Sequence, residues 1–153
     1  MSLLEVERRV AHQPTDLFNL VGDVRRYPEF IPWIKAMRVS QIKEEGPKTR
    51  FLAEALVGFK MIRERFSTWV ARDAEALSIA VDLHSGPFKV LQNRWKFLPD
   101  GRGTLVKFAI DFEFSSSLLQ MVLSANKDIA AQMIMDAFIR EADRRYGHQS
   151  AIS

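Results

Sequence analysis

The sequence contains no cysteine, and this absence excludes a disulfide framework and a thiolate metal site. Its three histidines, His12, His84 and His148, lie far apart, and no HxxxH pair or cluster of acids at metal-ligand spacing accompanies them. A Gly-rich phosphate loop and a Ser in a nucleophile-elbow context are also missing. The sequence therefore predicts no metal site and offers no motif for phosphate binding or nucleophilic catalysis.

Long apolar runs are absent as well. No stretch approaches the roughly 18 consecutive apolar residues of a membrane-spanning helix, and the first residues lack the features of a signal peptide. The 153 residues, 47% hydrophobic and 27% charged, predict one globular domain over residues 1–153, in a soluble, cytoplasmic protein. The net charge of +3 is not gathered in blocks, so DNA is not expected as a partner. Contact with anionic lipid headgroups or RNA phosphates remains compatible with this mild excess of bases.

Alternation of apolar and polar residues predicts a sheet of about seven strands. The first strand spans Leu4 to Val10, and short helices are expected after Pro14 and within the Pro-bounded segment 23–33. The other strands are expected at 34–43, 50–60, 61–72, 77–84, 89–98 and 106–114. Their connections are too short for crossovers, so the sheet is antiparallel and the fold class is α+β.

The final segment, residues 115–146, has no Pro and no internal Gly, and predicts one helix about 45 Å long. Its apolar face is broad: Leu118, Leu119, Val122, Ile129 and Met133 lie on one side, and a row through Phe138 drifts around the helix. Two interpretations stay open, a helix against a curved sheet with a void beneath it, or an ordinary core helix bent near Asn126. A wide sheet covered by a single helix leaves a cavity lined by apolar side chains.

Aromatic residues are more numerous than a core of this size requires, and several lie in Pro-bounded or Gly-Pro turns, where gates are often found. The predicted cavity and gate consist of Phe30, Pro32, Trp33, Val57, Phe59, Phe66, Trp69, Pro87, Phe88, Leu91, Asn93, Trp95, Phe97, Phe112, Phe114, Met133 and Phe138. Asn93 is unusual because alternation places it on the face of Leu91 and Trp95. A buried Asn needs a partner for its amide, which is an internal group, a water or a ligand carbonyl.

Acid–base chemistry has six candidate residues, Glu54, Arg63, Glu64, Arg94, Asp111 and Glu113. Alternation favours solvated outer faces for all of them, and a register slip of one residue would turn any of them inward.

Several separated segments resemble the coenzyme Q-binding protein family, within the helix-grip fold of the START and polyketide-cyclase superfamily. They are 23–33 (DVRRYPEFIPW), 57–60 (VGFK), 86–89 (GPFK), 95–97 (WKF) and 110–114 (IDFEF). The resemblance implies a curved sheet wrapped around a long C-terminal helix, with two short helices after the first strand. It also implies a tunnel for ubiquinone or a similar isoprenoid lipid, serving respiration or quinone delivery. One bacterial branch of the family is named a ribosome-association toxin, and the lack of a mitochondrial presequence points to a bacterial relative.

Three functions follow from these observations. The first is a non-catalytic carrier of a polyprenyl quinone. In that case Pro32-Trp33 and Pro87-Phe88 would dip into a bilayer, and Arg25, Arg26 and Lys89 would meet headgroups at the inner membrane face. The second is docking on the large ribosomal subunit, for which the basic pI is the compositional support. The third is a cyclase-like enzyme, which requires an inward-facing acid–base pair.

Overall fold

The computed structural model describes residues 3–59, 61–117 and 126–147, with the side chain of residue 59 excepted. The described elements are β1 (Leu4–Val10), α1 (Pro14–Gly22), the 3-10 helix η1 (Val24–Glu29), β2 (Ile34–Glu45), β3 (Lys48–Phe59), β4 (Ile62–Asp73), β5 (Ser78–Ser85), β6 (Phe88–Asp100), β7 (Gly103–Phe114) and α3 (Lys127–Tyr146). This order confirms the predicted α+β class and the two short helices after the first strand.

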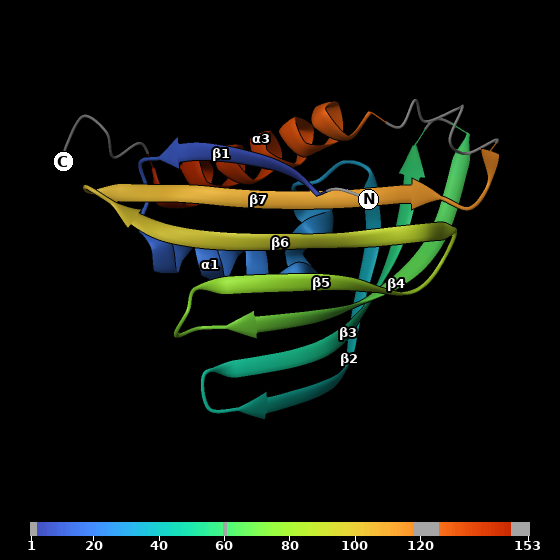
Figure 1. Ribbon diagram of the computed structural model, residues 1–153, viewed down its shortest axis with the longest axis horizontal. Coiled ribbons are helices and arrows are strands. Elements are labelled where there is room, and N and C mark those ends of the chain that lie inside the picture. Colours follow the sequence, from blue (N-terminus) through green and yellow to red (C-terminus); the bar gives the residue numbers. More distant parts are fainter. Residues whose placement is uncertain (1–2, 60, 118–125, 148–153) are drawn as a thin grey trace.

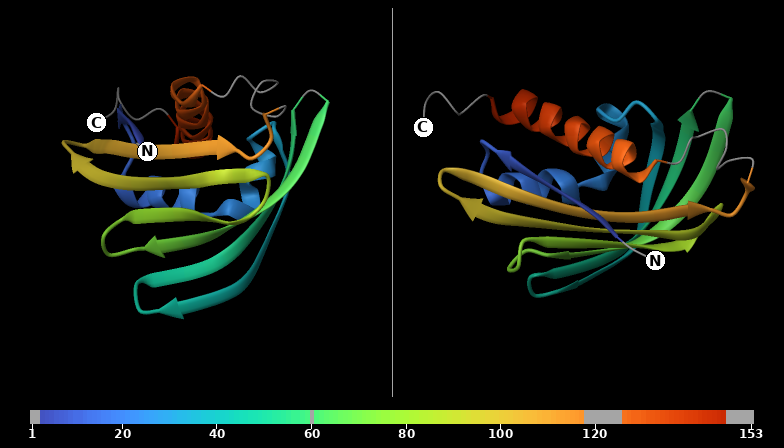
Figure 2. Two further views of the ribbon diagram at one scale, coloured as in Figure 1. Left: turned by 45° about the vertical axis from the view of Figure 1, so that its right-hand side comes forward. Right: turned by 45° about the horizontal axis from the view of Figure 1, so that its top comes forward.

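The strands form one antiparallel sheet in the order β1-β7-β6-β5-β4-β3-β2. Consecutive strands from β2 to β7 pair as hairpins, and β1 pairs with β7. The sheet curves strongly, and α1 and α3 lie on its concave side (Figures 1 and 2). The core therefore lies between the concave face and the helices, as the helix-grip resemblance implies.

Strand alternation determines which side chains enter this core. On β7, Val106, Phe108 and Ile110 are buried at two-residue spacing. The turn from β5 to β6 requires Gly86, which has φ +145° and lies so close to β4 that an added Cβ would be 2.4 Å from Phe66 Cβ. This close approach holds the β5–β6 turn against the start of β4.

The predicted single helix over 115–146 is wrong, because α3 begins at Lys127. Asn126 is extended, and its Oδ1 accepts hydrogen bonds from the backbone N–H groups of Asp128 (3.0 Å) and Ile129 (3.1 Å). An Asn side chain that bonds the backbone in this way starts a helix and does not continue one from the preceding residues. The helix is therefore interrupted at Asn126, the position near which the second interpretation of the sequence expected a bend. The predicted helical residues Leu118, Leu119 and Val122 lie outside the described residues.

Polar contacts attach α3 to the start of the chain. Arg8 of β1 donates to Asp136 at 3.1 Å and to Gln132 at 2.6 Å. His12, which is 1% exposed, lies with its Nε2 2.7 Å from Asp143 Oδ1. These contacts join residues from opposite ends of the sequence.

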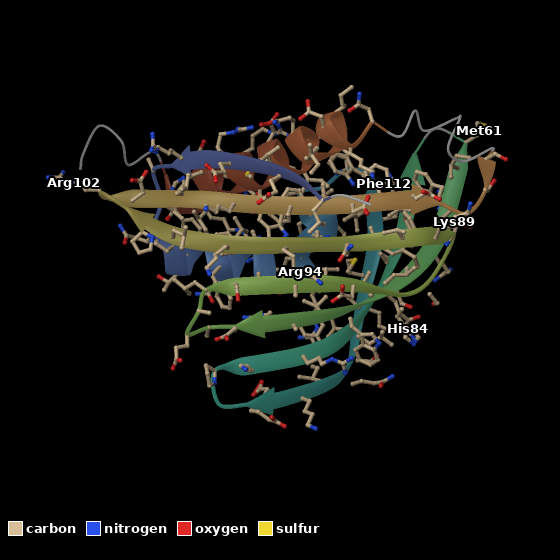
Figure 3. All side chains as sticks on the ribbon, viewed as in Figure 1. Met61, His84, Lys89, Arg94, Arg102 and Phe112 are labelled. Atoms are coloured by element: carbon tan, nitrogen blue, oxygen red, sulfur yellow. The ribbon has the colours of Figure 1, made fainter. Side chains whose placement is uncertain are left out.

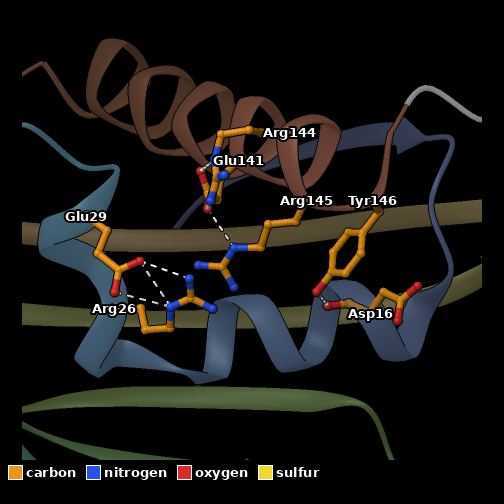
Figure 4. A network of polar contacts seen from close by, with 7 residues as sticks. All are labelled: Asp16, Arg26, Glu29, Glu141, Arg144, Arg145 and Tyr146. Atoms are coloured by element: carbon orange, nitrogen blue, oxygen red, sulfur yellow. Dashed lines mark hydrogen bonds and ion pairs between the residues drawn. The ribbon is translucent and has the colours of Figure 1, made fainter.

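A second group of polar contacts lies within α3, opposite the Arg26–Glu29 pair of η1 (Figure 4). Glu141 is buried and accepts hydrogen bonds from the guanidinium groups of Arg144 and Arg145. Arg145 also lies over the ring of Phe30, 5.5 Å from its centroid. The hydrogen bond from Arg144, assisted by Arg145, lowers the pKa of Glu141 from its ordinary value of 4.5 to about 2.

Because the pKa of Glu141 is lowered in the folded protein, we predict that the free energy of unfolding falls as Glu141 becomes protonated in acid. The contribution of Glu141 is complete above the pKa of an unfolded Glu and disappears as the pH falls towards about 2. We expect the Glu141→Gln variant to be less stable than the parent at neutral pH, and the difference to shrink between about pH 4.5 and 2. Urea unfolding across this range measures it. Glu113→Gln, which removes only an exposed 3.6 Å pair with Lys89, is the control, and equal pH profiles for the parent and Glu141→Gln would contradict the prediction.

Candidate ligand-binding cavity

A cavity of about 200 Å³ lies between the concave face of the sheet and the helices. Alternate residues of six strands line it: Ile34 and Met37 on β2, Ala53, Ala55 and Val57 on β3, Phe66, Thr68 and Val70 on β4, Ile79 and Val81 on β5, Leu91, Asn93 and Trp95 on β6, and Phe108 and Ile110 on β7. The other lining residues are Val21 and Val24, Tyr27 and Ile31, Trp33, and Ile134 and Phe138 of α3. The lining thus includes residues from nearly every element of the fold.

Small residues on β3 help to create this space. Ala53 and Ala55 are 2% and 7% exposed and face the cavity from the middle of the strand. Their short side chains do not reach the helices across the bend of the sheet, so the concave surface and α3 remain apart at this point.

Among the described residues the lining is almost entirely apolar and contains no Asp, Glu, Lys, Arg or His. Tyr27 donates its hydroxyl to the backbone oxygen of Val21, and burial raises the pKa of this phenol, so Tyr27 stays neutral. Thr68 adds a hydroxyl and Asn93 an amide. Such a lining favours an uncharged, largely apolar occupant.

Asn93 has an unsatisfied polar atom in this lining. Its Oδ1 is buried and has no hydrogen-bond partner in the described part of the chain. Asn93 is paired across the sheet with Val81 of β5 and Ile110 of β7, so its neighbours supply no polar side chain. An unsatisfied buried amide oxygen costs about 1–3 kcal/mol, and a ligand that supplies a hydrogen-bond donor recovers that energy. The prediction that Asn93 lies on the inner face of its strand is confirmed.

Seven of the predicted site residues line the cavity: Trp33, Val57, Phe66, Leu91, Asn93, Trp95 and Phe138. Phe30 and Phe97 instead pack in the core beside it, Phe30 against Phe138 and Phe97 against Phe18. Pro32 is exposed and Pro87 half-buried, and neither lines the cavity. For Phe59 only the position in β3 is described. Ligand contact by the seven lining residues stays a prediction.

Two of the predicted positions need correction. Met133 is 45% exposed on α3, where the neighbouring Ile134 faces the cavity, because the break at Asn126 leaves a shorter helix whose inner face includes Ile134 and Phe138. Trp69 is excluded by alternation along β4, where Phe66, Thr68 and Val70 face inward. Its ring lies beneath Arg50, 3.9 Å away, and against His84 at 5.6 Å.

Phe88, Phe112 and Phe114 form a row of rings that begins at the cavity wall. Phe66, which lines the cavity, contacts Phe88 edge-on at 5.3 Å, and Phe88 stacks on Phe114 at 5.0 Å. Phe112 follows at 5.8 Å from Phe114. The row extends from the cavity towards the end of the sheet where the β3–β4 and β5–β6 turns lie, which we call the turn end.

Exposure of the lining increases towards the turn end. Val70, Ile79 and Trp95, nearer the opposite end of their strands, are buried. Val57, Phe66 and Leu91, nearer the turn end, are half-buried. The accessible side of the cavity is therefore the turn end.

None of the six acid–base candidates lines the cavity. Arg94 pairs with Asp82 at 2.9 Å, and Asp111 is buried against Lys127 at 2.5 Å. Glu54, Arg63 and Glu113 are exposed, whereas Glu64 shares the inward face of β4 but lies beyond Phe66, outside the lining. Within the described ranges no group of three or more His, Asp or Glu side chains is placed to hold a metal ion.

Sequence reasoning missed several lining residues. Thr68 and Met37 were not expected in the site, although Thr68 lies two residues from Phe66 on an inward-facing row. Extending the alternation from Phe66 along β4 would have found it. Met37 lies beyond a bulge between Ile34 and Ala36, which strict alternation cannot anticipate.

Comparison with known proteins identifies the family. Residues 10–139 match the family described as polyketide cyclase / dehydrase and lipid transport. The chain belongs to this family. It is 35% identical over 132 residues to the ribosome association toxin RatA of Pseudomonas aeruginosa, covering 86% of this chain and 88% of that protein. It is also 31% identical over 147 residues to the mitochondrial coenzyme Q-binding protein coq10 of Schizosaccharomyces pombe, covering 94% of this chain and 88% of that protein.

Solved structures of the same fold include an 18 kDa protein from Caulobacter crescentus. It is 44% identical, has a TM-score of 0.78, and the match covers 97% of this chain and all of that one. The Zhui aromatase/cyclase from a Streptomyces species has a TM-score of 0.77 over 95% of both chains, at 16% identity. This second likeness shows the polyketide-cyclase fold alone.

Proposed function

We propose that this member of the polyketide cyclase / dehydrase and lipid transport family binds a polyprenyl quinone, or a similar isoprenoid lipid with a small polar ring, in the cavity. The proposal rests on the almost entirely apolar lining around one amide, that of Asn93. Its unsatisfied Oδ1 is an acceptor and suits the hydroxyl of the reduced quinol, whereas a quinone carbonyl would accept from the amide N–H of Asn93. An uncharged ring presents few polar groups, and an isoprenoid chain needs only apolar contact, at about 0.8 kcal/mol for each buried methylene-sized unit. The coenzyme Q-binding relative supports the same ligand class.

The size of the cavity determines how such a ligand would lie. Small-molecule pockets usually measure roughly 300–1,000 Å³. The 200 Å³ of this cavity accommodates a ring but not a long isoprenoid tail. The ring would lie near Asn93, and the tail would leave through the turn end, past the row of Phe side chains.

The proposed role is binding without catalysis. A cyclase-type reaction needs a general acid or base within reach of the substrate. In the described part of the chain the lining has no charged or imidazole side chain, and the phenol of Tyr27 donates to the backbone oxygen of Val21. The fold shared with cyclases therefore provides the cavity, and the side chains that line it favour a lipid carrier over an enzyme.

Replacing Asn93 tests the ring position, with effects of opposite sign on stability and affinity. Asn93→Leu removes the unsatisfied amide, so we expect the free protein to gain about 1–3 kcal/mol of unfolding free energy. Affinity for a short-chain ubiquinol analogue should fall about tenfold, since the hydrogen bond that its hydroxyl donates to Asn93 Oδ1 in a dry site is lost. Urea unfolding and fluorescence titration measure the two effects. Gln92→Leu, on the same strand but outside the cavity lining, is the control, and undiminished affinity in Asn93→Leu would refute the ring position.

The function itself is tested on the purified protein by native mass spectrometry and solvent extraction. A quinone or other isoprenoid lipid recovered in stoichiometric amount is the expected result. The second candidate is ribosome association, favoured by the similarity to RatA proteins and by Trp69 beneath Arg50, an arrangement suited to stacking on RNA bases. A protein that is empty, takes up no added quinone and sediments with ribosomes at low salt would favour this alternative.

A further inference from the structure

The β3–β4 turn carries the most exposed large apolar side chain of the described residues. Met61 is 96% exposed, next to the first residue of β4. It projects at one end of the molecule, together with Lys89 and well away from Arg102 at the other end (Figure 3). A flexible apolar side chain that is almost fully exposed at the tip of a hairpin has a large area to bury elsewhere.

Cations accompany Met61 at the start of β4. Arg63 and Arg65 are exposed, and within the described residues neither forms an ion pair. They pair across the sheet with Gly58 and Leu56, so both lie on the face opposite to Val57 and the cavity. The half-buried Glu64 between them points to the cavity side. The outer side of this hairpin is therefore positively charged around an exposed apolar tip.

The same hairpin borders the accessible side of the cavity. Val57 and Phe66, which both line the cavity, lie a few residues from the tip on β3 and β4. Phe66 begins the row through Phe88 to Phe114 at this end. A ligand leaving past these rings would emerge beside Met61.

We propose that the turn end docks on an anionic lipid bilayer, with Met61 inserted among the acyl chains and Arg63 and Arg65 on the headgroups, so that the cavity opens directly onto the membrane. This inference rests on the proposed function, because a membrane contact at the turn end serves a cavity that takes a membrane lipid. Apolar insertion and cation attraction act together in such peripheral contacts. Within the described residues no helix is long and apolar enough to cross a membrane.

The docking element differs from those expected from the sequence. Trp33 lines the cavity and Phe88 packs between Phe66 and Phe114, so neither ring projects. Arg26 pairs with Glu29 at 2.9 Å, and Lys89 with Glu113 at 3.6 Å. Arg25 is exposed and forms no ion pair within the described residues, but the projecting apolar side chain, Met61, belongs to the β3–β4 hairpin, beside Arg63 and Arg65.

Flotation with vesicles of phosphatidylcholine, with and without phosphatidylglycerol, tests the proposal. The parent should bind the anionic vesicles, and Met61→Asp should lower the partition coefficient roughly tenfold. Arg63→Ala combined with Arg65→Ala should have a similar effect, roughly tenfold, on anionic vesicles only. The matched control is Ile42→Asp. Ile42 is 50% exposed and lies near the β2–β3 turn, which is at the other end of β3 from the β3–β4 turn (Figure 1).

The outcomes separate this proposal from the quinone proposal. Binding of a short-chain ubiquinone analogue in solution, without vesicles, should be equal in the parent and in Met61→Asp. If the parent does not bind anionic vesicles, or if Met61→Asp and Ile42→Asp weaken binding equally, the docking surface is wrong. The quinone proposal then stands or falls on the solution titration alone.

Discussion

The Ala55→Phe variant is expected to lose quinone binding while it keeps its fold. Ala55 faces the cavity from the middle of β3, and a benzyl group at this position would occupy much of the 200 Å³ space. Excluding a ring-sized group removes about 3 kcal/mol of apolar burial, so affinity for a short-chain ubiquinone analogue should fall roughly 100-fold. Because the new ring enters an existing void, the melting temperature should stay the same or rise.

A graded series makes this result specific. Ala55→Leu should give an intermediate loss of affinity, and Ala71→Phe, at an exposed position on β4, should leave affinity unchanged. Isothermal titration and thermal unfolding on the same preparations provide both quantities. Full quinone binding by a folded Ala55→Phe protein would show that the ligand does not occupy this cavity.

Trp95→Ala should cause a large loss of stability. Trp95 is 5% exposed, stacks on Phe108 with ring centroids 4.1 Å apart, and meets Phe138 of α3 edge-on at 5.3 Å. Its removal enlarges an existing cavity and uncouples β6 from α3, so we expect a loss of about 3–5 kcal/mol in the free energy of unfolding. Urea unfolding of the ligand-free protein measures it.

Trp69→Ala is the matched control, because Trp69 lies on the outer face and contacts Arg50 and His84 instead of the core. Its loss should be about 1 kcal/mol, within the ordinary range for a substitution outside the core. Equal losses for the two Trp variants would contradict the assignment of Trp95 to the wall between sheet and helix.

Alternation made the sheet predictable from the sequence. Phe51, Ala53, Ala55 and Val57 repeat at two-residue spacing, and a half-buried strand requires this pattern, so both the strand and its inner face could be read directly. The inward position of Asn93 followed from the same rule. The final helix was predicted less well, since its start depends on the local hydrogen bonds of Asn126, and the absence of Pro and Gly does not reveal them.

The cavity was predictable in kind and only partly in detail. Residue type and position in turns suggested that many of the aromatic side chains contribute to it, but their location depends on packing between elements distant in sequence. Phe97 meets Phe18 of α1, and Phe30 meets Phe138 of α3, so both became core residues. The exposure of Met61 could not be predicted from the sequence either, because the sequence does not show whether another element covers an apolar residue in a turn.

The attachment of β1 has a consequence for how the chain folds during synthesis. Strands β2 to β7 pair with sequence neighbours and can form progressively, whereas β1 pairs with β7 at the far end of the order. His12 meets Asp143 across a sequence separation of 131 residues, and Arg8 meets Asp136 across 128. Loop-closure entropy must be overcome before such distant contacts form. The N-terminal strand therefore stays unpaired until β7 has left the ribosome, and its contacts with α3 form later still.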